Sequence, residues 1–293
     1  MSATYEAITS RNAGFLTRDD QEVLRTSSVL ICGVGGMGGA AAQTLARVGV
    51  GRMAITDPDR FEPSNLNRQT FAFLDTLGQK KSAVTRAALR RINPEIRVDV
   101  LGDDWTASLD RILPVHRVVV NGMDDIRAGI ELYRKAREHG ATVVDAYPSP
   151  CPSVFVTSPD DPRPEERLGF PTVGVPAAAL DEAEVQAAFL AEVDFVRCCS
   201  SGIDRLDPGV VAEILTGARP RSSFCPVVTI AGNLMAFEAV GCLLGRPSGA
   251  GPEGYFLDPW SGRVERPPSS RRPTHASAEA SPAEASPAPE GVA

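Results

Sequence analysis

Short runs of apolar residues alternate with longer amphipathic or alanine-rich stretches through the first half of the chain. Each short run predicts a buried strand, and each longer stretch predicts a helix. The predicted strands are Ser28–Cys32, Arg52–Asp57, Val98–Leu101, Val118–Asn121 and Thr142–Asp145. The predicted helices are Gly38–Val48, Lys80–Asn93, which ends at Pro94, and Asp125–Gly140. This alternation indicates an α/β fold with a mostly parallel sheet, right-handed crossovers and helices on both faces.

The regular alternation ends after Pro148. Residues 159–176 are rich in proline and charge and predict an irregular loop. Three helices, Asp181–Val196, Pro208–Thr216 and Pro226–Leu244, and a last strand, Tyr255–Asp258, are predicted after it. From residue 267 onward serine, proline, alanine and glutamate dominate, which is typical of disorder. We therefore expect a helical N-terminal arm (1–25), one α/β domain (26–265) with an irregular insertion (158–223), and a disordered tail (266–293).

Charge and composition narrow the possible functions. The net charge is −7 and the pI is near 5.2, which argues against nucleic-acid binding and against a general affinity for anionic membranes. We expect no apolar run long enough to span a bilayer, and the N-terminus lacks the profile of a signal peptide, so a cytoplasmic location is predicted. The six cysteines form no Cys-x-x-Cys pair, and only three histidines are present, so neither a closed zinc site nor a histidine-centred triad is expected.

A glycine-rich loop, Gly33-Val34-Gly35-Gly36-Met37-Gly38, follows the first predicted strand and opens the first long helix. Glycine lets the backbone approach a phosphate, and the helix N-terminus offers free N–H groups. Asp57 ends the second strand, ~20 residues further on, where it can bind ribose hydroxyls. The pattern favours a Rossmann-like nucleotide site, against a tight turn with no ligand, but it does not separate NAD, FAD and ATP.

The next polar segment changes that interpretation. Asp57-Pro58-Asp59 leads to Ser64-Asn65-Leu66-Asn67-Arg68-Gln69. An enzyme that expels pyrophosphate needs donors for the negative charge that develops on phosphate, and arginine can supply two parallel hydrogen bonds. Lys81 can act as a point charge on the α-phosphate, and Asp124, after the strand Val118–Asn121, can hold Mg²⁺. An attacking carboxylate, whose pKa is about 4, needs no general base at pH 7, which fits the scarcity of histidine.

These motifs together resemble the ubiquitin-activating (E1-like) superfamily of ThiF, MoeB and HesA type. The matching stretches are the glycine loop, Asp57-Pro58-Asp59, Ser64 to Gln69, Gly78-Gln79-Lys80-Lys81, Ile92-Asn93-Pro94 and Met123-Asp124-Asp125. The resemblance covers residues 11–146 and is weaker over 226–246. It implies a homodimeric adenylyltransferase that uses Mg-ATP to activate the C-terminal carboxylate of a ubiquitin-like or sulfur-carrier protein.

The resemblance also implies residue roles. Gly36 and Asp57 hold the nucleotide, Asn65, Arg68 and Lys81 contact phosphates, Asp124 binds magnesium, and Arg11 crosses to the partner's ATP. The predicted nucleotide-binding set is Gly33, Gly35, Gly36, Gly38, Asp57, Asp59, Ser64, Asn65, Asn67, Arg68, Gln69, Lys81, Asp124 and Asp125. Three features depart from the family: Asp125 replaces the usual asparagine, the paired Cys-x-x-Cys motif is absent, and residues 158–223 have no match.

Some members of this superfamily pass the acyl group to a cysteine. Cys225 is the preferred candidate because it precedes Pro226 at the start of a long helix, where the helix dipole favours a thiolate. Cys198 and Cys199 are rivals. Cys32 and Cys242 are interpreted as core residues, and Cys151 could line the substrate end of the sheet.

Alternatives to the adenylyltransferase remain open at this point. One is a non-catalytic subunit that only dimerises, although such a subunit would be expected to lose phosphate-contacting residues. Another is a NAD- or FAD-dependent oxidoreductase, which leaves Arg68, Lys81 and Asp124 unexplained. The acyl substrate is open among a carrier protein, a peptide and a small acid.

Overall fold

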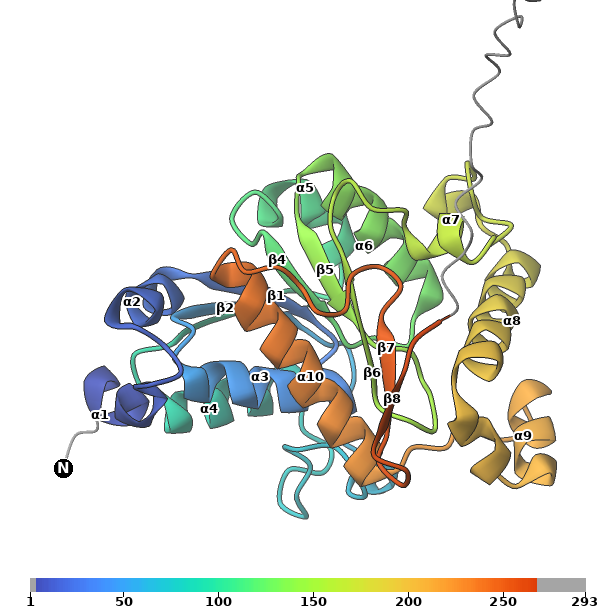
Figure 1. Cartoon of the computed structure of the whole chain (residues 1–293), viewed down its shortest axis with the longest axis horizontal. Helices are drawn as coiled ribbons and strands as arrows, with labels where there is room; N and C mark the ends of the chain where they lie inside the picture. Colours follow the sequence, from blue (N-terminus) through green and yellow to red (C-terminus); the bar gives the residue numbers. More distant parts are fainter. Residues whose placement is uncertain (1–3, 268–293) are drawn as a thin grey trace, which may run out of the picture.

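One eight-stranded sheet forms the centre of the computed structural model, which describes residues 4–267 (Figure 1). Its strand order is β3-β2-β1-β4-β5-β6-β7-β8. The first five strands are parallel: β1 (Ser28–Cys32), β2 (Arg52–Thr56), β3 (Arg97–Val100), β4 (Val118–Asn121) and β5 (Thr142–Asp145). The chain runs outward from β1 in one direction and then, from β4, in the other. This reversal opens a crevice beyond the carboxyl ends of β1 and β4, where ligands of such sheets bind.

Three antiparallel strands extend this sheet: β6 (Ser153–Thr157), β7 (Tyr255–Asp258) and β8 (Arg263–Glu265). The pattern predicted β7 and missed β6 and β8. All five residues of β6 are buried, and a turn at 146–152 joins it to β5 without a helix between them. The alternation of strand and helix does end after Pro148, but the chain turns back there and continues the sheet with β6, which the pattern missed.

Successive side chains of the central strands point to opposite faces of the sheet and form a hydrophobic core on each face. Val29 and Ile31 pack under α3 (Gly36–Val48), α4 (Lys81–Ile92) and α10 (Cys225–Leu243). Leu30 and Cys32 pack on the opposite face, under α5 (Leu109–Ile112) and α6 (Ile126–Glu138). The predicted mostly parallel sheet with helices on both faces is confirmed.

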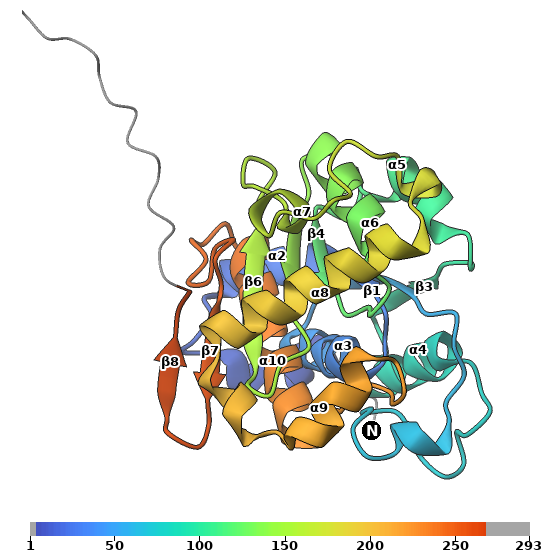
Figure 2. The same ribbon diagram turned by 90° about the vertical axis from the view of Figure 1, so that its right-hand side faces the viewer.

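The remaining elements lie around this layered core. The N-terminal residues form α1 (Tyr5–Thr9), a 3₁₀ turn (Ser10–Asn12) and α2 (Arg18–Thr26). Residues 158–223 contain α7 (Pro164–Arg167), α8 (Glu182–Cys199) and α9 (Pro208–Leu215). Figure 2 shows α8 running across the side of the molecule, with α9 beneath it. The predicted tail, 266–293, lies outside the described residues from residue 268 onward.

Helix α10 crosses α3 in close contact, as Figure 1 shows. Among residues 4–267 it is the one helix long and apolar enough to span a bilayer, with 19 residues and a mean hydropathy of 1.5. The expectation that no apolar run reaches that length is therefore wrong. A packed helix of a globular protein has the same properties, and Val227, Met235 and Ala239 of α10 are buried against the rest of the chain.

We predict that the crossing tolerates no side chain at Gly232. A Cβ there would collide with the carbonyl oxygen of Met37 and lie 2.8 Å from the Cβ of Ala40, whereas a Cβ on Gly241 of the same helix meets nothing within 4 Å. Gly232→Ala should lower the free energy of unfolding in urea by about 1–3 kcal/mol through overpacking. Gly241→Ala is the control and should raise it by about 0.5–1 kcal/mol through helix propensity. Equal effects of the two changes would contradict this packing.

Candidate functional site

The loop after β1, which begins at Gly33, and the loop after β4, which begins at Gly122, contact each other at the carboxyl ends of these strands. The N–H of Gly33 donates to Thr56 O at 2.8 Å, and the N–H of Gly122 donates to Cys32 O at 2.7 Å. Gly33 has a φ of 79°, and a Cβ there would lie 2.8 Å from the oxygen of Gly122. Only glycine fits both constraints. The loop is therefore fixed where it leads into the N-terminus of α3.

The carboxylate of Asp57 ties this glycine loop to the end of β2. One of its oxygens accepts the N–H of Val34 at 2.9 Å, and the other accepts the N–H of Asp59 at 3.0 Å. The residue is 8% exposed, and burial raises its pKa, an effect that the nearby Lys81 opposes. Asp57 thus positions the loop through backbone hydrogen bonds, beside the role toward a ribose that its place in the sequence predicts.

Lys81 is held in place at the start of α4. Its Nζ lies 2.8 Å from Oδ2 of Asp59, and its N–H donates to Asp59 O at 2.9 Å. The Lys81 side chain is 8% exposed, whereas that of Asp59 is 65% exposed. The ammonium group is therefore largely shielded from solvent, and its partner carboxylate faces outward.

The segment from Ser64 to Gln69 lies beside the glycine loop. Arg68 donates from Nη1 to Ser64 O at 2.9 Å and to Asn67 Oδ1 at 2.8 Å, and its Cγ would lie 3.9 Å from a Cβ on Gly36. Gln69 is buried with its amide 3.3 Å from where a Cβ on Gly35 would be. The aliphatic part of Arg68 and the amide of Gln69 therefore flank the N-terminus of α3.

Polar atoms in this segment differ in how fully they are paired. Asn65, which is 7% exposed, accepts the N–H of Glu62 at 3.1 Å and so closes its own turn. Oε1 of Gln69 is buried and has no hydrogen-bond partner within residues 4–267. Such an atom costs free energy unless a ligand or water satisfies it. It is the kind of group expected beside a bound polar ligand.

The start of α10 lies against the glycine loop as well. Cγ1 of Val228 would lie 2.5 Å from a Cβ on Gly36, and Nδ2 of Asn67 donates to Ser223 O at 2.9 Å. Cys225 is the first residue of α10, is exposed, and has its Sγ 3.7 Å from Oγ1 of Thr229. The N-termini of α3 and α10 therefore converge, and Cys225 stands less than one helical turn from the residue that touches the glycine loop.

Asp124 and Asp125 follow β4 and line a small cavity. Oδ1 of Asp125 accepts the N–H of Ala128 at 3.0 Å and caps α6. Aspartate and asparagine cap helices about equally well, so the departure from the family's asparagine has a structural explanation. Asp124 is exposed and has no hydrogen bond or ion pair in the described part of the chain. Its carboxylate is free to act as a ligand.

Arg11 is the predicted site residue that lies apart from the others. Its neighbour Asn12 donates from Nδ2 to Val48 O at 3.0 Å, at the C-terminal end of α3. The glycine loop is at the other end of this 13-residue helix, which is about 20 Å long. Arg11 is therefore not part of the site of its own chain.

The cavity beside Asp124 contains functional groups that the sequence analysis missed. Asp145, at the end of β5, accepts hydrogen bonds from Tyr133 Oη at 2.8 Å and from Asn121 Nδ2 at 3.0 Å, and burial raises its pKa to about 6. Its place at the carboxyl end of a parallel strand was a signal that could have found it. Glu192 of α8 and Arg221 line the same cavity.

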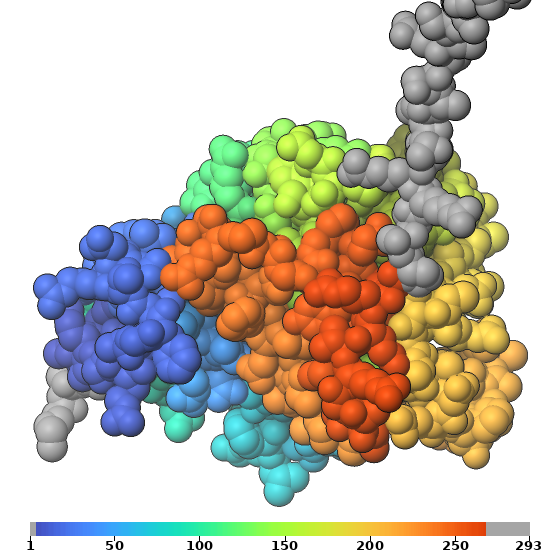
Figure 3. Space-filling model, viewed as in Figure 1, coloured from blue at the N-terminus to red at the C-terminus, as the bar shows by residue number. Residues whose placement is uncertain are grey.

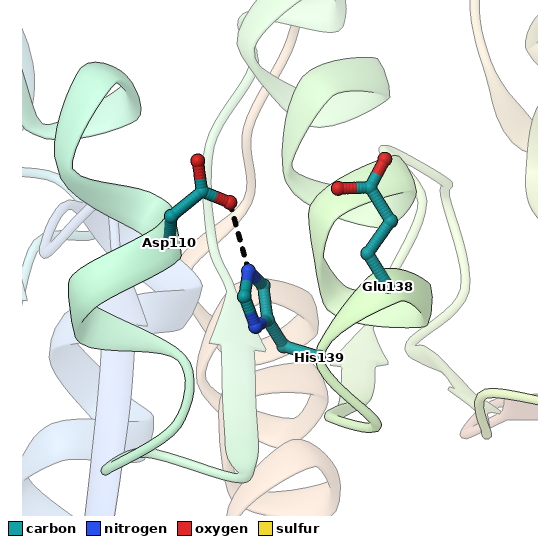
Figure 4. Close-up of side chains that lie close together, drawn as sticks. All are labelled: Asp110, Glu138 and His139. Carbon is teal, nitrogen blue, oxygen red and sulfur yellow. Dashed lines mark hydrogen bonds and ion pairs between the residues drawn. The ribbon is translucent and has the colours of Figure 1, made fainter.

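A second polar cluster, at the opposite end of α6, is an ion-pair network. Figure 4 shows Nε2 of His139 directed at Asp110, 2.8 Å away, with Glu138 nearby. Lys135 lies 3.0 Å from Asp110 and 2.9 Å from Glu138. Lys135 already pairs with both carboxylates, and His139 with Asp110, so this cluster gives no reason to expect a metal ion.

Comparison with protein families then identifies the chain's relatives. The model of the ThiF family matches residues 9–278. The chain belongs to the ThiF family. This confirms the resemblance on which the motif analysis depended. The two loops at the ends of β1 and β4, Arg68 and Lys81 all lie inside the matched region of this ThiF-family chain.

Two curated relatives match parts of the chain. A tRNA threonylcarbamoyladenosine dehydratase of Bacillus subtilis (strain 168) is 44% identical over 92 residues, which cover 31% of this chain and 36% of that protein. A molybdopterin-synthase adenylyltransferase of Escherichia coli (strain K12) is 44% identical over 111 residues, covering 37% of this chain and 44% of that protein. The chain thus spans less than half the length of these relatives in the matched regions.

Solved structures share the fold over a longer stretch. E. coli MccB with ATP has a TM-score of 0.60 and 18% identity, covering 87% of this chain and 67% of that one. PaaA has a TM-score of 0.58 and 18% identity, covering 89% of this chain and 68% of that one. At this identity the likeness shows the fold alone.

We predict that Lys81 contributes to nucleotide binding and Lys80 does not. Lys81→Met keeps the length of the side chain and removes the charge, and the Asp59 carboxylate that it leaves is exposed, so folding should be little affected. The affinity for Mg-ATP, measured by calorimetry, should fall about 10- to 100-fold through loss of a charged hydrogen bond. The exposed Lys80→Met is the matched control and should bind as the unmodified protein does. Equal affinities of the two variants would remove Lys81 from the site.

Proposed function

We propose that this protein adenylates a carboxylate with Mg-ATP and releases pyrophosphate. The observation that carries the proposal is that Arg68 and Lys81 both lie next to the glycine loop that opens α3. The Cγ of Arg68 would lie 3.9 Å from a Cβ on Gly36, and Lys81 is joined to the loop through Asp59 and Asp57. We take Arg68, Lys81 and the N-terminus of α3 as three sources of positive charge for a phosphate chain bound at this loop. Holding a dinucleotide needs only the helix N-terminus. The relative named molybdopterin-synthase adenylyltransferase supports the same reading.

The proposed step is an in-line displacement. An oxygen of the substrate carboxylate forms a bond to the α-phosphorus, and the bond between that phosphorus and the bridging oxygen to the β-phosphate breaks. Pyrophosphate leaves with the electron pair, and the acyl-adenylate remains. No proton moves, because the carboxylate is ionised at pH 7. Arg68 neutralises charge on the phosphates and Lys81 on the α-phosphate, while Asp57 keeps the loop in position.

Magnesium fits the carboxylates beside this loop. Mg²⁺ is bound through one or two carboxylates together with substrate phosphates, and Asp124 offers an exposed carboxylate without a partner in residues 4–267. Asp125 has one oxygen engaged in capping α6. We assign Asp124 as the ligand and Asp125 as the residue that orients the turn. The ion would neutralise charge on the phosphates when bound.

The organisation that we propose keeps residues 26–265 as one adenylation domain and residues 1–25 as an arm that acts on a partner subunit. We also propose a cytoplasmic location and no nucleic-acid or membrane partner. The net charge of −7 supports the second part, because it disfavours binding to anionic surfaces. The carboxylate belongs to a carrier protein, a peptide or a small acid.

Arg68 should be essential for pyrophosphate release. Replacing it with alanine removes donors to the charge that develops in the transition state, which typically costs about 10²- to 10³-fold in rate. We expect that loss in substrate-dependent ATP–pyrophosphate exchange. Arg86→Ala, an exposed change on α4, should keep the full rate. Undiminished exchange in a folded Arg68→Ala protein would rule out the role given to Arg68.

A homodimer would explain the distant position of Arg11. Exposed apolar side chains lie on the arm and on α10, with Phe15 88% and Phe237 75% exposed. Figure 3 shows the arm and α10 side by side on one face of the molecule. Large exposed apolar residues on neighbouring elements mark an interaction surface. A second copy bound there would bring its Arg11 toward this chain's site.

Mixing two inactive variants tests this arrangement. Arg11→Ala and Asp124→Ala chains, each inactive alone, should regain about a quarter of the unmodified activity when mixed dimers form, because random pairing leaves one intact site in half of the dimers. Exchange is measured after co-refolding, and each variant refolded alone is the control. Mixed dimers without recovered activity would show that Arg11 does not act across an interface.

Cys225 is our candidate for a second step, in which the thiolate attacks the acyl carbon and AMP leaves. It is exposed at the N-terminus of α10, three residues before Val228, which lies against the glycine loop. Cys225→Ser should keep pyrophosphate exchange and lose any reducible adduct with the acyl substrate, detected by gel electrophoresis with and without thiol. Cys198→Ser is the control. An adduct that survives in Cys225→Ser would assign the step to another cysteine.

A further inference from the structure

A cavity of about 50 Å³ lies next to Asp124, between α6, α8 and the end of β5. Its charged lining is strongly acidic, with Asp124, Asp125, Asp145, Glu165 and Glu192 against a single cation, Arg221. A space of this size holds a few non-hydrogen atoms. The cavity adjoins Asp124, to which we assign the magnesium ion, so a substrate whose carboxylate reaches the α-phosphate can extend into it.

Two of these acids already have partners. Glu165 is 3% exposed and pairs with Arg134 at 2.6 Å and with Arg163 at 3.3 Å. Asp145 accepts hydrogen bonds from Tyr133, from Asn121 and from its neighbour's N–H. Neither carboxylate therefore needs a ligand for its own stability.

Glu192 differs from them. It is half-buried on α8, and within residues 4–267 it has no hydrogen bond and no ion pair. Arg221 is engaged elsewhere, with its guanidinium 4.3 Å from the centroid of the Phe189 ring. Burial and the charge of Asp145 raise the pKa of Glu192 to about 8, against the opposing charges of Arg221 and Arg167. Neither arginine forms an ion pair with Glu192 within the described residues, so its charged form has no direct partner, and a ligand cation beside it would supply one.

We infer that Glu192 recognises an ammonium or guanidinium group on the acyl substrate. This inference rests on the proposed adenylation. The substrate is then a carboxylic acid with a cationic group in the same residue, either a free basic amino acid or the basic C-terminal residue of a peptide. Its carboxylate lies at the α-phosphate near Asp124, and its cation enters the cavity and pairs with Glu192. A carrier that ends in two glycines has no such group at its terminus.

Matched substrate pairs test the inference directly. ATP–pyrophosphate exchange is measured with arginine against citrulline, which differ in charge and little in shape, and with Gly-Gly-Arg against Gly-Gly-citrulline. We expect kcat/KM to favour the cationic member of one pair by about 30-fold or more, as for a buried ion pair that loses one partner. The pair that shows the effect distinguishes a free amino acid from a peptide terminus.

The variant Glu192→Gln shows whether this residue is responsible. It should bring the ratio of kcat/KM for the cationic substrate to that for the neutral substrate close to one. The change should come from a lower kcat/KM for the cationic substrate, while exchange with the neutral one is kept. Asp194→Asn on the same helix, whose side chain is 72% exposed, is the matched control and should keep the preference. Because Glu192 has no partner to lose, Glu192→Gln should melt at or above the temperature of the unmodified protein. Glu192→Lys should reverse the preference toward glutamate over glutamine.

Other outcomes separate this inference from the proposed function. Exchange that is equal within each pair, or that occurs only with a carrier ending in two glycines, would overturn the role of Glu192 and leave the adenylation intact. A preference that persists in Glu192→Gln would also overturn it. No exchange with any of these acids or carriers, in protein that binds ATP, would overturn the proposed adenylation and the inference with it.

Discussion

The site depends on one carboxylate, that of Asp57, which joins the glycine loop to the turn after β2. Its two oxygens accept the N–H groups of Val34 and Asp59. Asp59 in turn holds Lys81 at 2.8 Å. The position of the ammonium relative to the N-terminus of α3 therefore follows from a short chain of hydrogen bonds that begins at Asp57. Because the carboxylate is buried, an unfilled acceptor there would be costly, and this keeps both loops in place.

The sequence predicted the first half of the fold well because β1, β2, β4 and β5 are almost wholly buried and its helices have clear limits. β4 and β5 begin and end where the pattern indicated. β6 and β8 were missed for physical reasons. β6 reverses direction without a helix, so alternation gave no signal, and β8 has only three residues. Length and composition likewise do not separate a helix packed on α3 from one that crosses a bilayer.

The candidate site could be predicted where its residues follow strand ends, and not where they come from distant elements. Asp57 and Asp124 stand directly after strands, and parallel strands bring their carboxyl ends together. Glu192 comes from α8, and its position depends on how that helix crosses α6, which no local pattern encodes. Nor does the sequence show that Arg11 and the glycine loop lie at opposite ends of α3.

The central claim is that a carboxylate oxygen attacks the α-phosphorus of ATP. The most direct measurement uses a carboxylate labelled with ¹⁸O on both oxygens, a nucleophile that accepts the acyl group, and mass spectrometry of the released nucleotide. The account predicts AMP that carries one ¹⁸O atom, because the bridging oxygen stays with phosphorus when the acyl group leaves. ADP as the product, or AMP without label, would contradict the account.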